Sequence, residues 1–154
     1  MESKTKQKIL NFANTKEFNI NDDGDNKLWA VNGSTVVHIE ISKLNDGTEM
    51  VEFLSTVVIE PRIDEQLLRK LLALNANFNF GAFGMWDDGT IVFKYNILGG
   101  DHMDIDEFDT AFTMVAIIAD EYDNKIISTH GGKTALDYHK EVIEKQENRK
   151  MLPW

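Results

Sequence analysis

The sequence predicts an α+β domain in which helices pack on a mostly antiparallel sheet. Three observations support this fold class. Asn-Gly and Asp-Gly pairs separate short apolar runs, apolar residues alternate within those runs, and longer segments repeat apolar residues every three or four positions. Tight turns place consecutive strands side by side and antiparallel, and the longer repeat is that of a helix. The expected order of elements is α-β-β-β-α-β-β-α, followed by a C-terminal tail helix.

The chain is long enough for one domain with a substantial core. Its 154 residues are 42% hydrophobic and include nine Phe and three Trp, which is typical of a folded protein. We expect the domain to span residues 1–127, with a hinge and a charged tail helix over residues 128–154. The absence of cysteine excludes a disulfide scaffold, a thiol nucleophile and a thiolate metal site.

The N-terminal third is predicted to be a short helix, a turn and a three-stranded meander. Residues 4–15 carry apolar side chains at helical spacing, and the Asn, Asp and Gly residues at 21–26 are typical of a turn. Asn32-Gly33 is a strong hairpin signal because both residues tolerate positive φ. Apolar residues alternate from Val51 to Ile59, so one face of the third strand is expected to be buried. The three strands are expected at residues 28–31, 35–44 and 49–59.

The remainder is predicted to be a helix, a second hairpin and a long helix. Asp64 is placed to cap a Leu-rich helix that ends near Asn75. Its apolar face is wider than one sheet contact requires, which indicates burial on two sides or a subunit interface. Asp87-Asp88-Gly89 joins the two strands of the hairpin. These strands are expected at residues 83–86 and 90–98, the long helix at 105–126, a linker at 128–132 and the tail helix at 135–149.

The charge of the chain restricts its partners. The formal net charge is −10 and the sequence pI is about 4.8, with the basic residues scattered. Nucleic acids and anionic membranes attract clustered Lys and Arg, so neither is expected as a partner. A basic or neutral protein segment is compatible with this charge, and solubility alone explains the charge equally well. No apolar run has the length of a signal peptide or a membrane span, so we expect a cytoplasmic protein.

The motifs that carry catalysis or metal binding are incomplete. His130-Gly131-Gly132-Lys133-Thr134 ends like a phosphate-binding loop, but position 127 is Ile where that motif requires Gly. The run from Asp22 to Asp25 lacks the Glu that closes a calcium loop, because position 33 is Gly. Asp101, His102 and Asp104 form the best metal candidate, although Asp residues before a helix usually act as caps. We therefore predict no metal, no cofactor and no enzyme. A hydrolase with paired carboxylates stays open, because pairing in space does not follow from the sequence.

One stretch of the sequence carries a family resemblance. The Leu-rich helix ends in a Leu-Asn-x-x-Phe-x-x-Gly-x-Phe run from Leu74 to Phe83. The pattern continues through the turn at 87–89, the strand at 91–95 and Ala119–Asp123 near the end of the long helix. With these features the chain resembles the YbjN family and the type III secretion chaperone-like fold over residues 5–127, with the tail after Gly131 outside the resemblance.

The resemblance implies a bacterial, non-catalytic, acidic and often dimeric protein. Secretion chaperones of this fold hold a client segment in an extended form along apolar patches, and their second helix and the neighbouring strand commonly form a homodimer interface, here residues 63–74 and 83–86. The YbjN side of the family implies instead a sensory or regulatory role through protein association. We therefore carry two hypotheses, a client-binding chaperone or adaptor and a regulatory module whose tail helix docks on a partner or on its own core.

Eight apolar residues are the expected contact residues of either hypothesis, although core packing explains the same residues equally well. The interface candidates are Leu67, Leu71, Leu74, Phe83 and Met85. The candidates for anchoring a bound segment are Phe78, Phe80 and Trp86.

Overall fold

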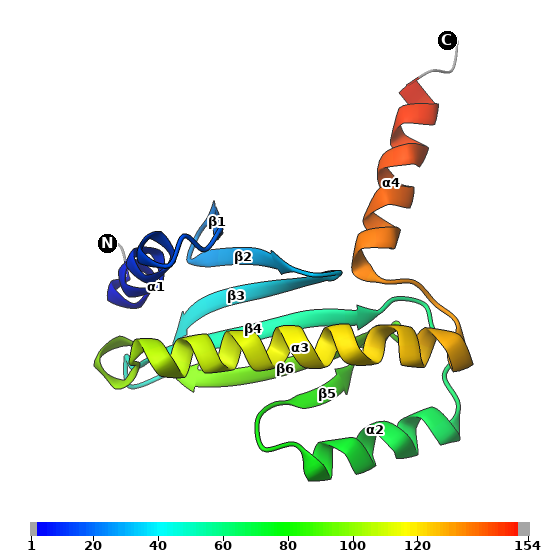
Figure 1. The fold of residues 1–154 in the computed structure, drawn as a ribbon, viewed down its shortest axis with the longest axis horizontal. Coiled ribbons are helices and arrows are strands. Elements are labelled where there is room, and N and C mark those ends of the chain that lie inside the picture. Colours follow the sequence, from blue (N-terminus) through cyan, green and yellow to red (C-terminus); the bar gives the residue numbers. More distant parts are fainter. Residues whose placement is uncertain (1–2, 151–154) are drawn as a thin grey trace.

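The fold is a single antiparallel sheet with its long helix lying across one face (Figure 1). We analysed a computed structural model that describes residues 3–150. The helices are α1 (Lys4–Thr15), α2 (Glu65–Asn77), α3 (Ile105–His130) and α4 (Ala135–Lys150), with a short 3-10 helix η1 (Gly100–His102). The strands are β1 (Asn21–Gly24), β2 (Lys27–Asn32), β3 (Thr35–Lys43), β4 (Glu49–Val58), β5 (Ala82–Met85) and β6 (Ile91–Leu98).

The predicted fold class is confirmed. The sheet has the order β1-β2-β3-β4-β6-β5, and every neighbouring pair is antiparallel. Strands β1 to β4 are neighbours in sequence and in space, whereas β4 pairs with β6 and leaves β5 at the edge. Helix α2 lies beside this edge strand, and α4 projects from the body as the tail helix (Figure 1).

The turn expected at residues 21–26 is partly wrong, because its first four residues form strand β1. Only Asp25 and Asn26, both at positive φ, make the turn into β2. Two tertiary contacts hold the polar strand in place: Lys6 of α1 pairs with Asp22 at 2.9 Å, and the indole N–H of Trp29 donates to Asp23 at 3.0 Å. Local propensity favours a turn here, and contacts with distant residues override it. The β2–β3 hairpin likewise turns one residue later than expected, between the paired residues Asn32 and Thr35.

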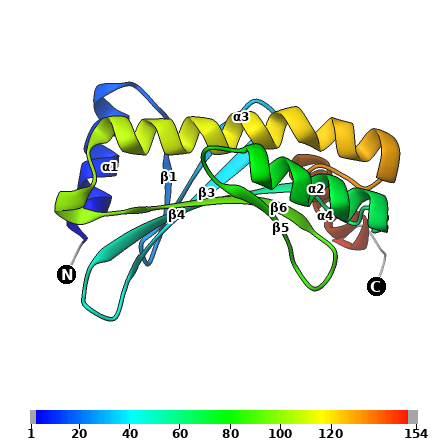
Figure 2. The same cartoon turned by 90° about the horizontal axis from the view of Figure 1, so that it is seen from below.

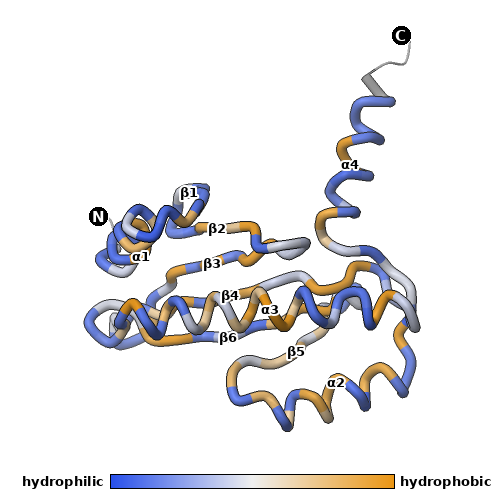
Figure 3. Tube along the Cα trace, viewed as in Figure 1, coloured by the Kyte–Doolittle hydropathy of each residue, from blue (hydrophilic) through white to orange (hydrophobic). Residues whose placement is uncertain are grey.

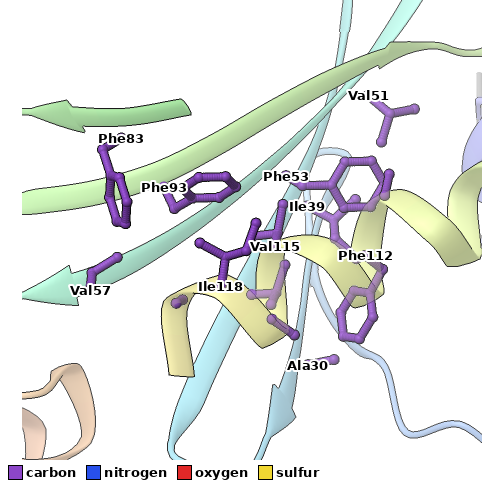
Figure 4. Close-up of a cluster of buried hydrophobic side chains, with 14 of the residues drawn as sticks. Ala30, Ile39, Val51, Phe53, Val57, Phe83, Phe93, Phe112, Val115 and Ile118 are labelled. Carbon is purple, nitrogen blue, oxygen red and sulfur yellow. The ribbon is translucent and has the colours of Figure 1, made fainter. Parts of the chain in front are cut away.

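The core lies between the sheet and α3. Side chains from β3, β4 and β6 meet the apolar stripe of α3 (Figure 4). Phe53, Phe93 and Phe108 are fully buried, and their rings pack edge-on or tilted against neighbouring rings, an arrangement that aromatic pairs favour. The alternation predicted for the third strand is confirmed at Val51, Phe53 and Val57, while Ile59 lies beyond the strand and is half-buried.

The long helix ends later than expected, at His130 rather than near Ile126. The imidazole of His130 is almost fully buried and lies 2.9 Å from the carboxylate of Asp64, which caps α2. Thr129 donates its hydroxyl to backbone carbonyl groups one turn back. These contacts extend the helix through residues whose own propensity is weak.

The segment between α3 and α4, expected to be a hinge, is fixed to the end of β4. The N–H of Ile59 donates to the carbonyl of Lys133 at 2.8 Å, and the N–H of Lys133 donates back to Ile59 at 2.8 Å. The N–H of Arg62 donates to the carbonyl of His130 at 2.7 Å. The root of α4 is therefore held by backbone pairing. The division of the chain at residue 127 stays a prediction.

One buried carboxylate lies at the junction of the β2–β3 turn, α3 and the root of α4. Asp123 is 3% exposed. The hydroxyl of Ser34 lies 3.1 Å from Asp123 and 2.5 Å from Asp120. A hydroxyl has one proton, so it can donate to only one of the two carboxylates. The pKa of Asp123 is raised, mainly by burial and to a smaller extent by the negative charges of Asp120 and Asp137. Hydrogen bonds from Asn124 and Ser34 lower it, but they do not cancel the effect of burial.

We expect Asp123→Asn to raise the melting temperature at neutral pH. A raised carboxyl pKa means that the fold favours the protonated form, so this contribution to stability is present below the ordinary pKa of 3.8 and is lost as pH rises through the folded value. The amide imitates the protonated acid. The gain should therefore be largest at pH 7 and shrink toward pH 4, measured by thermal unfolding across that range.

Asp109→Asn is the matched control, because Asp109 is an exposed residue of the same helix. It should give no gain that depends on pH in this way. An Asp123→Asn protein that melts below the parent at pH 7 would contradict the expectation.

Candidate functional site

One face of the sheet is left uncovered over its centre. Figure 2 shows α1 and α3 on one side of the sheet and no helix beneath the middle of the other side, within residues 3–150. Side chains directly opposite one another in the ladder share a face. His38 pairs with Leu54, Leu54 with Lys94, and these positions alternate with the buried Ile39, Phe53 and Phe93. The uncovered side, which we name the open face, carries Trp29, Val31, Val36, His38, Met50, Leu54, Lys94 and Leu98.

The open face is partly apolar and exposed. Val31 is 50% exposed and Leu98 is 45% exposed. Lys94 pairs with Glu52 at 2.8 Å, so its charge is compensated within the face. A mixed surface of this kind can bury apolar side chains of a partner while its polar groups keep hydrogen bonds.

A hollow next to this face lies over β5 and β6, with a volume of about 450 Å³. Three of its residues, Gly81, Ala82 and Gly84, have little or no side chain. At one end of the hollow, the side chain of Trp86 is 48% exposed and that of Met85 is 46% exposed. We name this hollow the β5–β6 groove. Short residues beside exposed apolar ones make a surface that can receive an apolar side chain.

The outer edge of β5 is closed at one position by a side chain of α2. Asn75 accepts the N–H of Phe83 at 2.7 Å and donates to the carbonyl of Phe83 at 3.1 Å. Its carboxamide thus makes the two hydrogen bonds that a neighbouring strand would make. Free sheet edges invite pairing with other chains, and covering them is a common protection. Addition of a strand at Phe83 would require Asn75 to leave.

The structure divides the eight candidate residues into two groups. Leu67, Leu71 and Phe83 are buried in the core, and Leu74 and Phe78 are partly buried against it. These five have less free surface than the other three, because α2 turns its main Leu stripe toward α3, and their role as contact residues stays a prediction. Phe80 (40% exposed), Met85 and Trp86 remain available to a partner. Their role as contact residues stays a prediction.

Sequence reasoning missed several exposed apolar residues. Leu72 of α2 is 70% exposed, and Val31 and Leu98 lie on the open face. The helical period separates Leu72 from the stripe formed by Leu67, Leu71 and Leu74, so its exposure was readable in principle. The exposure of the strand residues depends on which face of the sheet the helices cover. A local sequence pattern does not predict that face.

A second, smaller hollow of about 110 Å³ lies between α2 and α3. Leu67, Leu71, Tyr122 and Ile126 line it, and His130 lies at its end. The pKa of Asp64 lies below its ordinary value. The main cause is the hydrogen bond that its carboxylate accepts from the N–H of Leu67, and the second is its hydrogen bond with His130. The polar groups at this end are thus paired with one another, and the hollow is apolar and small.

Two carboxylates from the sequence patterns considered for metal binding serve local structure. Asp104 caps α3 by accepting the N–H of Glu107 at 2.8 Å, and Asp22 accepts the N–H of Gly24 at 2.9 Å. Within the described part of the chain, no three His, Asp or Glu residues come together as they would around a metal ion. No helix among the described residues has the length and apolar character to cross a membrane.

Comparison with known proteins identifies one family. The model of the family TY-Chap1, described as "T3SS (YopN, CesT) and YbjN peptide-binding chaperone 1", matches residues 7–138. The match confirms the resemblance drawn from the sequence and extends it past residue 127 into the first turn of α4. No curated protein matches the chain.

Proposed function

Because the chain belongs to the TY-Chap1 family of T3SS and YbjN peptide-binding chaperones, we propose that it binds an extended segment of a client protein in the β5–β6 groove. The protein has a chaperone-like, protein-binding role, and the groove is the place on its surface where the geometry suits a peptide best. As part of the same proposal, the protein acts in the cytoplasm and without catalysis.

The observation that carries the proposal is the lack of side chains along the groove. Gly84 and Ala82 leave space over the sheet, and Trp86 and Met85 stand exposed beside it. Large exposed apolar residues are costly in water and are a frequent sign of a binding surface. Aromatic residues also dominate the energetics of protein interfaces.

Recognition would depend on side chains more than on strand addition. The side-chain amide of Asn75 is hydrogen-bonded to the backbone N–H and carbonyl of Phe83. A peptide added as a seventh strand on β5 would first have to displace this amide. A segment lying over the groove needs no such displacement. The apolar residues of the open face then continue the contact toward the middle of the sheet.

A homodimer formed through α2 belongs to the same proposal. Leu72, at 70% exposure, is the apolar side chain of α2 that such an interface would bury. Sedimentation equilibrium at micromolar concentration tests it, and a monomeric mass would remove this part of the proposal.

A regulatory role through protein association is the second candidate, and α4 favours it. The helix projects from the body and is mostly hydrophilic (Figure 3), yet Tyr138 and Ile143 are about two-fifths exposed. Isolated helices of this length are marginal in water. A partner that packs on these residues would stabilise α4, and removal of residues 135–154 would then abolish that association.

We expect Gly84→Val to weaken peptide binding by roughly tenfold or more and to leave the fold intact. The backbone of Gly84 is ordinary strand, and a Cβ there would meet only Val92 Cγ2 at 3.5 Å, an ordinary contact. The larger side chain would fill the groove. Losing the burial of one apolar residue costs about 1.5–3 kcal/mol, or roughly tenfold or more in affinity. Fluorescence anisotropy with a short labelled peptide that alternates leucine and serine provides the measurement.

The matched control is Thr15→Val, which places the same side chain at an exposed position of α1, on the side of the sheet away from the open face. It should leave the affinity unchanged. Undiminished binding by a folded Gly84→Val protein would exclude the groove as the site. Absence of binding by the parent protein would count against the function itself.

A further inference from the structure

The β5–β6 turn places carboxylates at the end of the groove. The turn Asp87-Asp88-Gly89 follows Trp86 directly and leads into β6. Asp88 is used by the turn itself, because its carboxylate accepts the N–H of Thr90 at 2.9 Å. Asp87 is exposed and, within the described residues, makes no hydrogen bond or ion pair. The residue that follows the groove residue Trp86 in the chain therefore carries a carboxylate that is free to meet a partner.

The nearest cation of the groove does not compensate this charge. Lys94 is the one basic residue that lines the groove, and it already pairs with Glu52 at 2.8 Å. The two turn carboxylates are thus left as the excess charge of the site. The whole chain, at −10, adds a negative field of the same sign.

From this charge pattern we propose that the segment bound in the groove carries a lysine or arginine beside its apolar anchor, and that Asp87 selects it. The inference rests on the groove being the binding site. The apolar residue fills the space over Gly84, and the neighbouring cation meets Asp87 at the turn. Burial in the groove supplies most of the affinity, while the exposed charge pair supplies discrimination and faster association.

An acidic segment is disfavoured by the same groups. Like charges placed together at an interface are a general means of excluding wrong partners. Since Asp88 is fixed by Thr90 and Asp87 follows Trp86 in the chain, an acidic residue beside the anchor would meet two carboxylates. Lys94, the basic residue among the described residues that line the groove, is already paired. The site therefore distinguishes clients by the sign of the charge next to the anchor.

The test compares two labelled peptides that differ only in charge. Both alternate leucine with serine, and one serine beside a central leucine is replaced by arginine in one peptide and by glutamate in the other. By fluorescence anisotropy at low salt, the parent protein should bind the arginine peptide about two- to fivefold more tightly than its match, the range expected for one exposed charge pair. The preference should weaken as salt is added.

Asp87→Lys should reverse the preference, because it converts the free carboxylate into a free cation. Glu147→Lys is the control, since it makes the same change of charge at an exposed residue of α4. That variant should keep the preference of the parent, apart from a small change due to the net charge.

The outcomes separate this inference from the function on which it rests. Equal binding of the two peptides by the parent, weakened in Gly84→Val, would overturn the charge selection and keep the groove. A preference that Glu147→Lys and Asp87→Lys change alike would show an effect of net charge only and would also overturn the role of Asp87. Failure of the parent to bind either peptide would remove the proposed function together with the inference.

Discussion

Gly81→Ala is expected to destabilise the protein by about 2–5 kcal/mol, because the substitution combines backbone strain with a steric clash. Gly81 has a φ of +75°, a conformation that residues with a Cβ rarely adopt. A Cβ at this position would lie 2.6 Å from Phe93 Cε1 and 2.9 Å from the carbonyl oxygen of Lys94. Phe93 is fully buried, and Lys94 belongs to a strand paired on both sides, so neither can move away at low cost.

Urea unfolding measures this loss as a lower midpoint with an unchanged slope. Gly84→Ala is the matched control, since it lies three residues further along the same segment and has room for a Cβ. Its midpoint should equal that of the parent or exceed it, because alanine loses less chain entropy than glycine on folding. Equal midpoints for Gly81→Ala and Gly84→Ala would contradict the argument from close approach.

The contrast between these two glycines bears on the site as well as on stability. Gly81 brings the chain close to β6 at the start of β5, and Gly84 leaves the groove open. One glycine is required by the fold, and the other leaves a space that the fold does not need. A position of the second kind is a better indication of function than the first, because packing does not explain it.

The sequence predicted the sheet well where turn chemistry is local. The hairpin predicted at Asn32-Gly33 forms one residue later, the hairpin at Asp87-Asp88-Gly89 forms as predicted, and alternation in β4 identified the buried face correctly. Strand β1 was missed because its residues are polar and favour a turn. Side-chain contacts with α1 and with Trp29 help to hold it beside β2. The last turn of α3 was missed for the same reason, since the partner of His130 is Asp64, far away in the sequence.

The candidate site was less predictable than the fold. A Leu stripe has the same pattern whether it faces a core or a partner, so Leu67 and Leu71 could not be assigned from periodicity. They are buried because α3 lies beside α2, a fact of tertiary structure. Phe80, Met85 and Trp86 were named from the sequence and are exposed, whereas the empty space over Gly84 has no signal in the sequence at all.

Phe108→Ala is expected to cost about 3–5 kcal/mol, the usual loss when a buried phenyl ring is removed. Phe108 is fully buried in the first turns of α3. Its ring lies 5.3 Å from that of Phe53 on β4, 5.8 Å from that of Phe12 on α1 and 6.5 Å from that of Phe112. The ring is therefore one of the contacts through which α1 packs on the core, beside the buried Ile9, and its loss leaves a cavity among three elements.

The loss should be unequal across the molecule. Amide hydrogen exchange should accelerate most in α1, which is otherwise held by the buried Ile9 and by the ion pair and hydrogen bonds of Lys6 and Lys8. The groove lies at the opposite edge of the sheet, so under conditions where the variant stays folded its affinity for the leucine–serine peptide should match the parent's. Phe80→Ala is the reverse control, because its exposed ring contacts Tyr95 beside the groove. That variant should keep its stability. Weakened binding in Phe108→Ala, with protection in α1 unchanged, would show that the groove depends on the whole core and not on its own edge of the sheet.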